Sequence, residues 1–166
     1  DQIPGALCTV MLFDPIARSL TVAAGKKLPG DFLRSIDGVK IGPEVGSCGT
    51  AAYFGKEVNS DIADDPKWDG HRDLPLQHGL RTCWSIPILR DNQAEAGDAS
   101  PMVLGTFSLY RRDTWTPDAD AEEILSNATY LARVAIEYST TQRSLKESEE
   151  RYRELVELAP DVVTIV

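Results

Sequence analysis

The feature that most constrains this chain is a long stretch without helix-breaking residues in its C-terminal third. No glycine or proline occurs between Pro117 and Pro160. Thr116 offers a capping hydroxyl, Pro117 suits the first helical position, and the acidic residues that follow favour the positive end of a helix dipole. The pattern predicts one helix over residues 117–159. About 40 helical residues would span roughly 60 Å, more than a small sheet needs, so we expect part of the helix to project.

The apolar pattern changes along this predicted helix. Over residues 124–136 the apolar face is broad, which suits packing on a sheet. Beyond Tyr138 it narrows to a seam at alternating steps of three and four residues: Gln142, Leu145, Glu149, Tyr152 and Val156. The two polar positions weaken this seam. Two interpretations remain open, a weak coiled coil in a parallel homodimer and a solvated linker helix.

Short apolar runs separated by turn residues predict an antiparallel sheet ahead of the long helix. Residues 7–13 and 20–24 are predicted to form one hairpin. Residues 57–62 form a short strand in this interpretation, and residues 83–89 and 102–110 form a second hairpin with a long polar tip. These runs account for a sheet of five strands.

Two helices and one irregular segment are predicted between these strands. Residues 29–36 have helical apolar spacing. A second helix is predicted to start near Ser47, as its N-cap, and to end at Gly55. Residues 65–78 mix proline, tryptophan, glycine and histidine without a period, which indicates a functional or capping loop with room for a turn of helix.

Composition excludes several classes of protein. With 166 residues, 42% of them apolar, the chain can bury the core of one ordinary domain. A net charge of −9 without a clustered basic stripe argues against nucleic acid as a partner. No apolar run approaches the roughly 18 residues of a membrane span, so we expect no membrane contact. Three widely spaced cysteines, Cys8, Cys48 and Cys83, do not suggest a disulfide framework, and we expect a cytoplasmic location.

Several motifs occur in order with plausible gaps: Ile41-Gly-Pro-Glu-Val-Gly-Ser-Cys-Gly-Thr-Ala-Ala-Tyr53, Asp61-Ile62, Asp65-Pro66-Lys67-Trp68, His78-Gly-Leu-Arg-Thr-Cys-Trp-Ser-Ile-Pro-Ile88 and Val103-Leu-Gly-Thr-Phe107. Together they resemble the GAF domains of bacterial histidine kinases and cyclic-di-GMP enzymes over residues 7–136. The resemblance implies an α+β GAF fold: a central antiparallel β-sheet of five to six strands flanked by helices, ligand-binding loops on one face, and a long C-terminal signalling helix. Family members also have a helix before the first strand, and we expect that helix to be absent from the GAF domain over residues 1–138.

Residues 147–161 resemble the entry to a PAS domain, where a helix ends at Ala-Pro-Asp and the first strand follows. We therefore expect a GAF domain over residues 1–138, a linker or signalling helix over 139–159, and the start of a truncated PAS domain over 160–166. The apolar run that ends at Val166 has no partner strand after it, so we expect that unit to continue further.

The candidate ligand-binding residues are Ser47, Cys48, Gly49, Tyr53, Trp68, His71, Arg72, His78 and Trp84. Backbone N–H groups at the start of the second helix, over residues 46–49, would suit a small anion, although a tight loop built with glycines is the plainer interpretation. The aromatic, arginine and histidine side chains would suit a pocket for a polar ligand. The alternative places Trp84 in the core, uses Trp68 to pin the loop, and pairs Arg72 with Asp69 or Asp73.

Cys48 has two interpretations, a thiol of low pKa at a helix N-terminus and a small buried apolar residue. No short pair of metal ligands supports a site built from His71, His78 and Cys83, so we expect no metal. The sequence identifies neither a cofactor nor the ligand.

Three functions remain for a chain of this kind. We expect a sensory module that binds a small molecule or a partner and relays the signal through the long helix to PAS and output domains of a histidine kinase, diguanylate cyclase or phosphodiesterase. A dimerisation module without ligand is the second. The third is an enzyme similar to the free methionine sulfoxide reductases, using Cys48, but residues 66–78 lack the second loop cysteine of those enzymes. We expect no catalytic residues.

Overall fold

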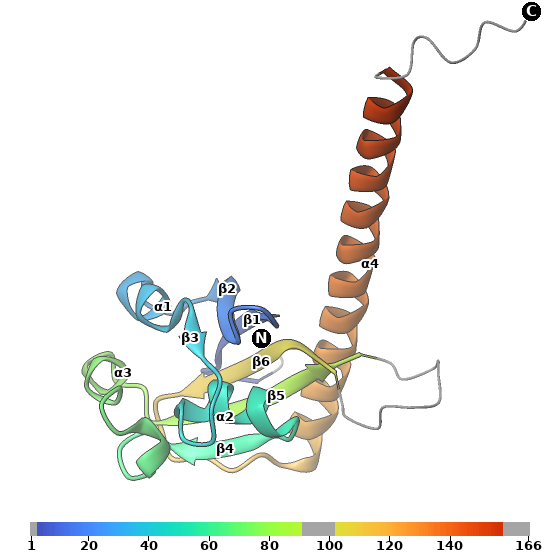
Figure 1. Ribbon diagram of the computed structural model, residues 1–166. Coiled ribbons are helices and arrows are strands. Elements are labelled where there is room, and N and C mark those ends of the chain that lie inside the picture. Colours follow the sequence, from blue (N-terminus) through green and yellow to red (C-terminus); the bar gives the residue numbers. More distant parts are fainter. Residues whose placement is uncertain (1–2, 91–101, 158–166) are drawn as a thin grey trace, which may run out of the picture. The chain divides into compact units, whose positions relative to one another are not determined.

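The computed structural model describes residues 3–90 and 102–157 of the chain (Figure 1). A boundary between Arg133 and Val134 divides the chain into two compact units. The first unit holds the sheet and its helices, and the second holds the later part of the long helix, so each is described by itself.

The first unit is built on one antiparallel sheet with the strand order β3-β2-β1-β6-β5-β4 (Figure 1). Its strands are β1 (Leu7–Asp14), β2 (Ser19–Lys26), β3 (Val39–Lys40), β4 (Val58–Asp61), β5 (Thr82–Leu89) and β6 (Val103–Arg111). All five strands predicted from the sequence are present. The sixth, β3, pairs with the start of β2 and was not predicted, because two residues are too few to display a period.

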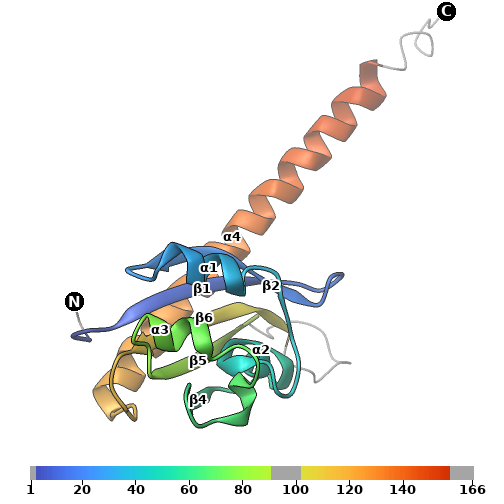
Figure 2. The ribbon, with the colours of Figure 1, turned by 90° about the vertical axis from the view of Figure 1, so that its left-hand side faces the viewer.

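Helices cover both faces of this sheet (Figure 2). One face carries α1 (Gly30–Ile36), α2 (Gly46–Phe54), the 3-10 helix η1 (Pro66–Trp68) and α3 (Asp73–Gln77). The first turns of α4 (Ala119–Glu157) pack on the opposite face, through Ala121 and Leu125. The fold is therefore the α+β GAF fold implied by the resemblance, with six strands and a long C-terminal helix.

Alternation along the strands separates two cores. On the α1 to α3 side, Leu7, Met11, Phe32 and Tyr110 are among the buried side chains. On the α4 side, Trp84 and Leu109 of the central strands pack against α4. Because successive residues of a strand point to opposite faces, the neighbouring pairs Cys83–Trp84 and Leu109–Tyr110 link the two cores directly.

Two details of the helix starts differ from the sequence-based expectations. Ser47 is not the N-cap of α2: Val45 holds that place without a side-chain cap, and Ser47 lies inside the helix. The long helix begins at Ala119 rather than Pro117, and the Asp118 carboxylate accepts a 2.9 Å hydrogen bond from the Ala121 backbone N–H. The Asp118 carboxylate satisfies the free N–H groups of the first turn better than the more distant Thr116 hydroxyl. The start of α4 therefore lies two residues later than predicted.

The second unit consists, in its described part, of the remainder of α4. The helix continues without a break to Glu157, and its apolar side chains at Tyr138, Leu145 and Tyr152 are exposed. Residues 158–166, where the PAS start is predicted, lie outside the described residues. In the described part of the chain, no helix is long and apolar enough to span a bilayer.

Candidate ligand-binding site

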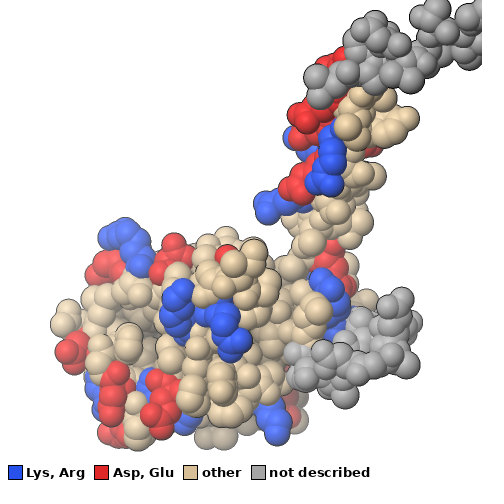
Figure 3. All heavy atoms as spheres, in the orientation of Figure 1, with Lys and Arg blue, Asp and Glu red and all other residues tan. Residues whose placement is uncertain are grey.

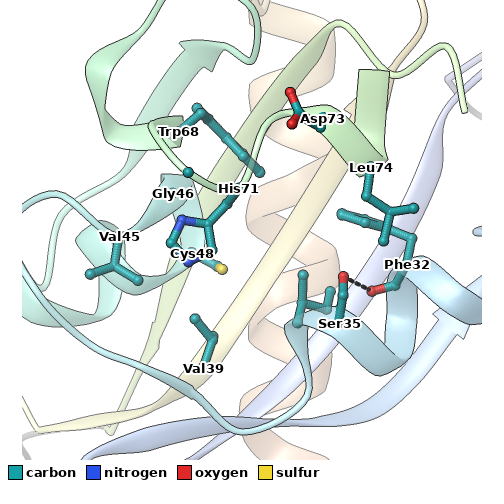
Figure 4. Close-up of a pocket in the computed structure, with 12 residues that line it drawn as sticks. Phe32, Ser35, Val39, Val45, Gly46, Cys48, Trp68, His71, Asp73 and Leu74 are labelled. Carbon is teal, nitrogen blue, oxygen red and sulfur yellow. Dashed lines mark hydrogen bonds between the residues drawn. The ribbon is translucent and has the colours of Figure 1, made fainter. Parts of the chain in front are cut away.

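A cavity of about 250 Å³ lies between α1, α2 and the segment that holds η1 and α3 (Figure 4). Its lining combines apolar walls with a few polar groups: Phe32, Ser35, Ile36, Val39, Val45, Gly46, Cys48, Trp68, Gly70, His71, Asp73 and Leu74. The lining residues come from separate elements that meet on one face of the sheet. This combination is typical of small-molecule sites.

Trp68 is held in the wall of the cavity by a chain of buried hydrogen bonds. Its indole Nε1–H donates to Ser60 Oγ at 2.8 Å, and Ser60 Oγ lies 2.5 Å from Ser47 Oγ. Ser47 Oγ donates to the carbonyl oxygen of Cys83 at 3.2 Å. Since that bond uses the Ser47 proton, the Ser60 hydroxyl donates to Ser47 and accepts from Trp68, and all three groups are satisfied.

Phe32 forms the opposite wall of the cavity. Its side chain is buried and meets Tyr110 edge to face, with ring centroids 5.4 Å apart. An edge-to-face pair of this kind contributes roughly 0.5 to 1.5 kcal/mol beyond the area that it buries. The ring of Phe32 is therefore held in place by the sheet beneath it.

A hydrogen bond joins α1 to the end of α3. His78, at the end of α3, lies with Nε2 2.9 Å from the Asp31 carboxylate of α1. The hydrogen bond with His78 holds the pKa of Asp31 below its ordinary value, so this carboxylate stays ionised at neutral pH. The contact ties α1 to the end of α3.

The buried thiols are unsuited to nucleophilic chemistry. Burial raises the pKa of Cys48 to about 12 and that of Cys83 to about 11. Both thiols are therefore protonated at neutral pH, whereas the thiolate is the reactive form. Among residues 3–90 and 102–157, no group of three or more His, Cys, Asp or Glu side chains could hold a metal ion.

The model of the GAF domain family matches residues 7–136. This chain belongs to the GAF family. One curated relative of this GAF domain, the methyl sulfide methyltransferase-associated sensor of Methanosarcina acetivorans, is 35% identical over 163 residues, 98% of the chain. The chain spans only 16% of that relative's length.

Solved structures share the fold at low sequence identity. The GAF domain of a two-component sensor histidine kinase from Bacillus halodurans has a TM-score of 0.59 and 14% identity, covering 82% of this chain and 84% of that one. The reduced form of fRMsr from Staphylococcus aureus has a TM-score of 0.55 and 16% identity, covering 80% and 72%. At these identities the likeness concerns the fold alone.

The structure brings three of the nine candidate residues of the GAF domain to the cavity, namely Cys48, Trp68 and His71. Ser47 lies behind the wall, in the hydrogen-bond chain that holds Trp68. Gly49 is packed so closely against Val45 that an added Cβ would lie 2.9 Å from the Val45 Cβ. These two residues therefore serve the packing of α2.

The other four candidates lie outside the cavity lining. Arg72 binds the Ala63 carbonyl and the Asp69 carboxylate, which is one of the two pairings considered from the sequence. Tyr53 is half exposed and packs edge-on against Phe54. His78 pairs with Asp31 as described, and Trp84 lies in the core on the α4 side, as the alternative interpretation held.

The predicted anion cradle at the start of α2 faces a hydrophobic neighbour. Gly46 has a φ of +53°, and a Cβ added there would lie 3.7 Å from the Trp68 ring. The 3.7 Å distance is ordinary van der Waals contact, so it is the positive φ of Gly46 that favours glycine at this position. The geometry favours the tight-loop interpretation of residues 46–49.

Sequence reasoning missed the contribution of α1 and α3 to the cavity. Phe32 and Ile36 were recognised as an apolar helical face, and Asp73 was considered only as a partner for Arg72. Helical spacing identifies side chains that turn inward, but it does not distinguish a side chain that meets another from one that borders empty space.

Proposed function

We propose that this GAF domain is the sensory module of a signalling protein, in which the cavity binds a small molecule and α4 carries the response to a following domain. The observation that carries the proposal is the cavity itself, formed by α1, α2 and α3 on the sheet whose other face holds the start of α4. The relative from Methanosarcina acetivorans is named a sensor, which supports the same function.

A short route connects the cavity wall with α4 within the first unit. Trp68 lies at one end, bonded through Ser60 and Ser47 to the backbone of Cys83. The next residue, Trp84, points to the other face and packs in the cluster that contains Leu125 of α4. A ligand that binds better to one position of Trp68 would also favour one arrangement of β5, the strand on which α4 rests. Such a difference in affinity shifts the population between the two arrangements.

The later part of α4 would pass the response on by pairing with a second chain. Tyr138, Leu145 and Tyr152 are exposed and recur every seven residues, as in the seam of a parallel coiled coil. We propose a parallel homodimer through this helix. A PAS domain would follow, as the resemblance over residues 147–161 suggests, and would connect the helix to an output domain such as a histidine kinase, a diguanylate cyclase or a phosphodiesterase.

We propose the division into a GAF domain over residues 1–138, a signalling helix over 139–159 and a PAS start over 160–166, close to the boundary between Arg133 and Val134. A cytoplasmic location fits three free cysteines. The competing function is a dimerisation module that pairs chains but binds nothing. Ligand binding separates the two.

Filling the cavity tests the sensory function. Ser35 lines the cavity from α1, and the neighbouring Arg34 does not, so Ser35→Trp and Arg34→Trp form a matched pair. We expect indole to raise the thermal unfolding midpoint of the natural chain and of the Arg34 variant, but not of the Ser35 variant. A ligand at 100 times its dissociation constant stabilises the folded state by about 2.7 kcal/mol. An equal shift in both variants, or none in the natural chain, would contradict the proposal.

A charge placed in the α4 seam tests pairing. Leu145→Glu should return the chain to a single-chain mass of 18.2 kDa in light scattering, whereas the natural chain should have twice that mass. The two glutamate carboxylates would face each other across the seam and repel, and the apolar contact made by Leu145 would be lost. Thr140→Glu introduces the same charge off the seam and should leave the pair intact. A natural chain that is monomeric at high concentration would rule out the homodimer.

A further inference from the structure

We infer that the cavity selects a planar, largely apolar molecule whose polar end is uncharged or positively charged, and that Asp73 is the residue that recognises a positive end. The inference rests on the proposed ligand-binding function and specifies the chemical class of the ligand. It is carried by the charges around the cavity and by its aromatic walls.

The walls favour a flat apolar body. Phe32 and Trp68 are only 1% and 3% exposed, so their rings are fixed before any ligand arrives. The aliphatic part of the lining consists of Ile36, Val39, Val45 and Leu74. An apolar cavity of about 150 Å³ accommodates benzene. The cavity of about 250 Å³ therefore has room for one or two fused rings with a short substituent.

The polar groups of the lining lack a fixed positive charge. Asp73 carries the one carboxylate among the lining residues, and these include His71 but no lysine or arginine. Both Asp73 and His71 are exposed. Within the described residues, the Asp73 carboxylate has no hydrogen-bond or ion-pair partner, so it is available to a ligand.

Three of the four cations adjacent in sequence to the lining residues are already engaged, and the fourth, Arg34, lies outside the lining with its Nη1 near Gly30. Arg72 binds the Ala63 carbonyl and Asp69, and Lys67 lies 3.2 Å from the Asp65 carboxylate. Lys40, beside Val39, donates to the Ala17 carbonyl at 2.8 Å. An anionic ligand would gain a counter-charge only by breaking one of these contacts or by drawing Arg34 in from outside the lining.

The balance of charge then favours a cation over an anion. Acidic and basic side chains are interspersed over the face in Figure 3, and the chain as a whole carries a net charge of −9. An anion in the cavity would lose hydration, meet Asp73 and find no lysine or arginine among the lining residues. A cationic group would gain the exposed carboxylate of Asp73. An exposed ion pair of this kind corresponds to a preference of up to about 5-fold.

Three compounds that share an indole ring and a two-carbon tail test the inference: tryptamine, tryptophol and indole-3-propionate. They differ at the end of the tail, which is positive, neutral and negative at pH 7. Calorimetric titration of the natural chain should give the tightest binding for tryptamine, intermediate binding for tryptophol and the weakest for indole-3-propionate. Asp73→Asn should reduce tryptamine affinity to that of tryptophol and leave tryptophol unchanged.

The control is Asp120→Asn, which removes the same charge from an exposed position on α4 outside the lining. It should leave all three affinities unchanged. Binding of indole-3-propionate as tight as that of tryptamine would overturn the inference while leaving the sensory function standing, and so would a tryptamine preference that survives Asp73→Asn. Failure of all three compounds to bind would instead overturn the proposed ligand-binding function, and the inference with it.

Discussion

Gly105→Ala is expected to destabilise the domain more than any other substitution that adds a single methyl group to the sheet. Gly105 lies on the central strand β6, opposite Leu12 of β1 and Ile88 of β5. A Cβ there would overlap the carbonyl oxygen of Met11, which belongs to the backbone and cannot turn away. Strands β1 and β6 would have to separate. We expect a loss of at least about 3 kcal/mol in the free energy of unfolding, the upper range for overpacking.

Urea denaturation followed by tryptophan fluorescence measures this loss, with Gly30→Ala as the control. Gly30 begins α1, and the nearest atom to an added Cβ is Nη1 of Arg34, at 3.4 Å and at the end of a flexible side chain. Alanine at this position should be neutral or stabilise by up to about 1 kcal/mol through the unfolded chain. Equal effects of the two substitutions would show that the close approach of β1 and β6 is wrong.

Replacing Leu125 with alanine is expected to loosen α4 from the sheet. Leu125 is 1% exposed and packs in one cluster with Trp84 and Leu109. Removing a buried leucine side chain leaves a space that the surroundings fill incompletely, at a cost of about 2 to 5 kcal/mol. Because Trp84 and Trp115 lie with ring centroids 5.9 Å apart beside this contact, their fluorescence should change along with the unfolding midpoint.

Ile16→Ala is the matched control for Leu125→Ala. Ile16 is 95% exposed in the turn between β1 and β2, so its truncation should change the free energy of unfolding by less than about 0.5 kcal/mol. If Leu125→Ala proved as mild as Ile16→Ala, α4 would not be anchored through this side chain. The proposed route from the cavity to the helix would then lose its last step.

The local elements of this GAF domain could be predicted because their signals are local. The hairpin of β1 and β2 follows from two apolar runs around a proline-containing turn, and α4 follows from the absence of glycine and proline. The end of α2 was also correct, since Gly55 takes the left-handed conformation for which glycine is suited. The family motifs supplied the connection of these elements into one sheet.

The role of Ser47 shows where local signals end. Its residue type and its place before a helix suggested a cap, but its hydroxyl faces Ser60 and the backbone of Cys83, which lie 13 and 36 residues further along the chain. A buried hydroxyl is satisfied by whichever partner packing brings near. That partner is a property of the assembled sheet.

The two tryptophans among the candidate residues take different places in the fold for the same reason. Trp68 and Trp84 carry identical side chains, yet Trp68 lines the cavity and Trp84 packs beneath α4. Residue order was enough for the strands, the long helix and the family, because periodicity and turn chemistry act between near neighbours. Whether a space stays open between Phe32 and Trp68, and which charges border it, depends on how distant segments pack, and only the folded chain decides that.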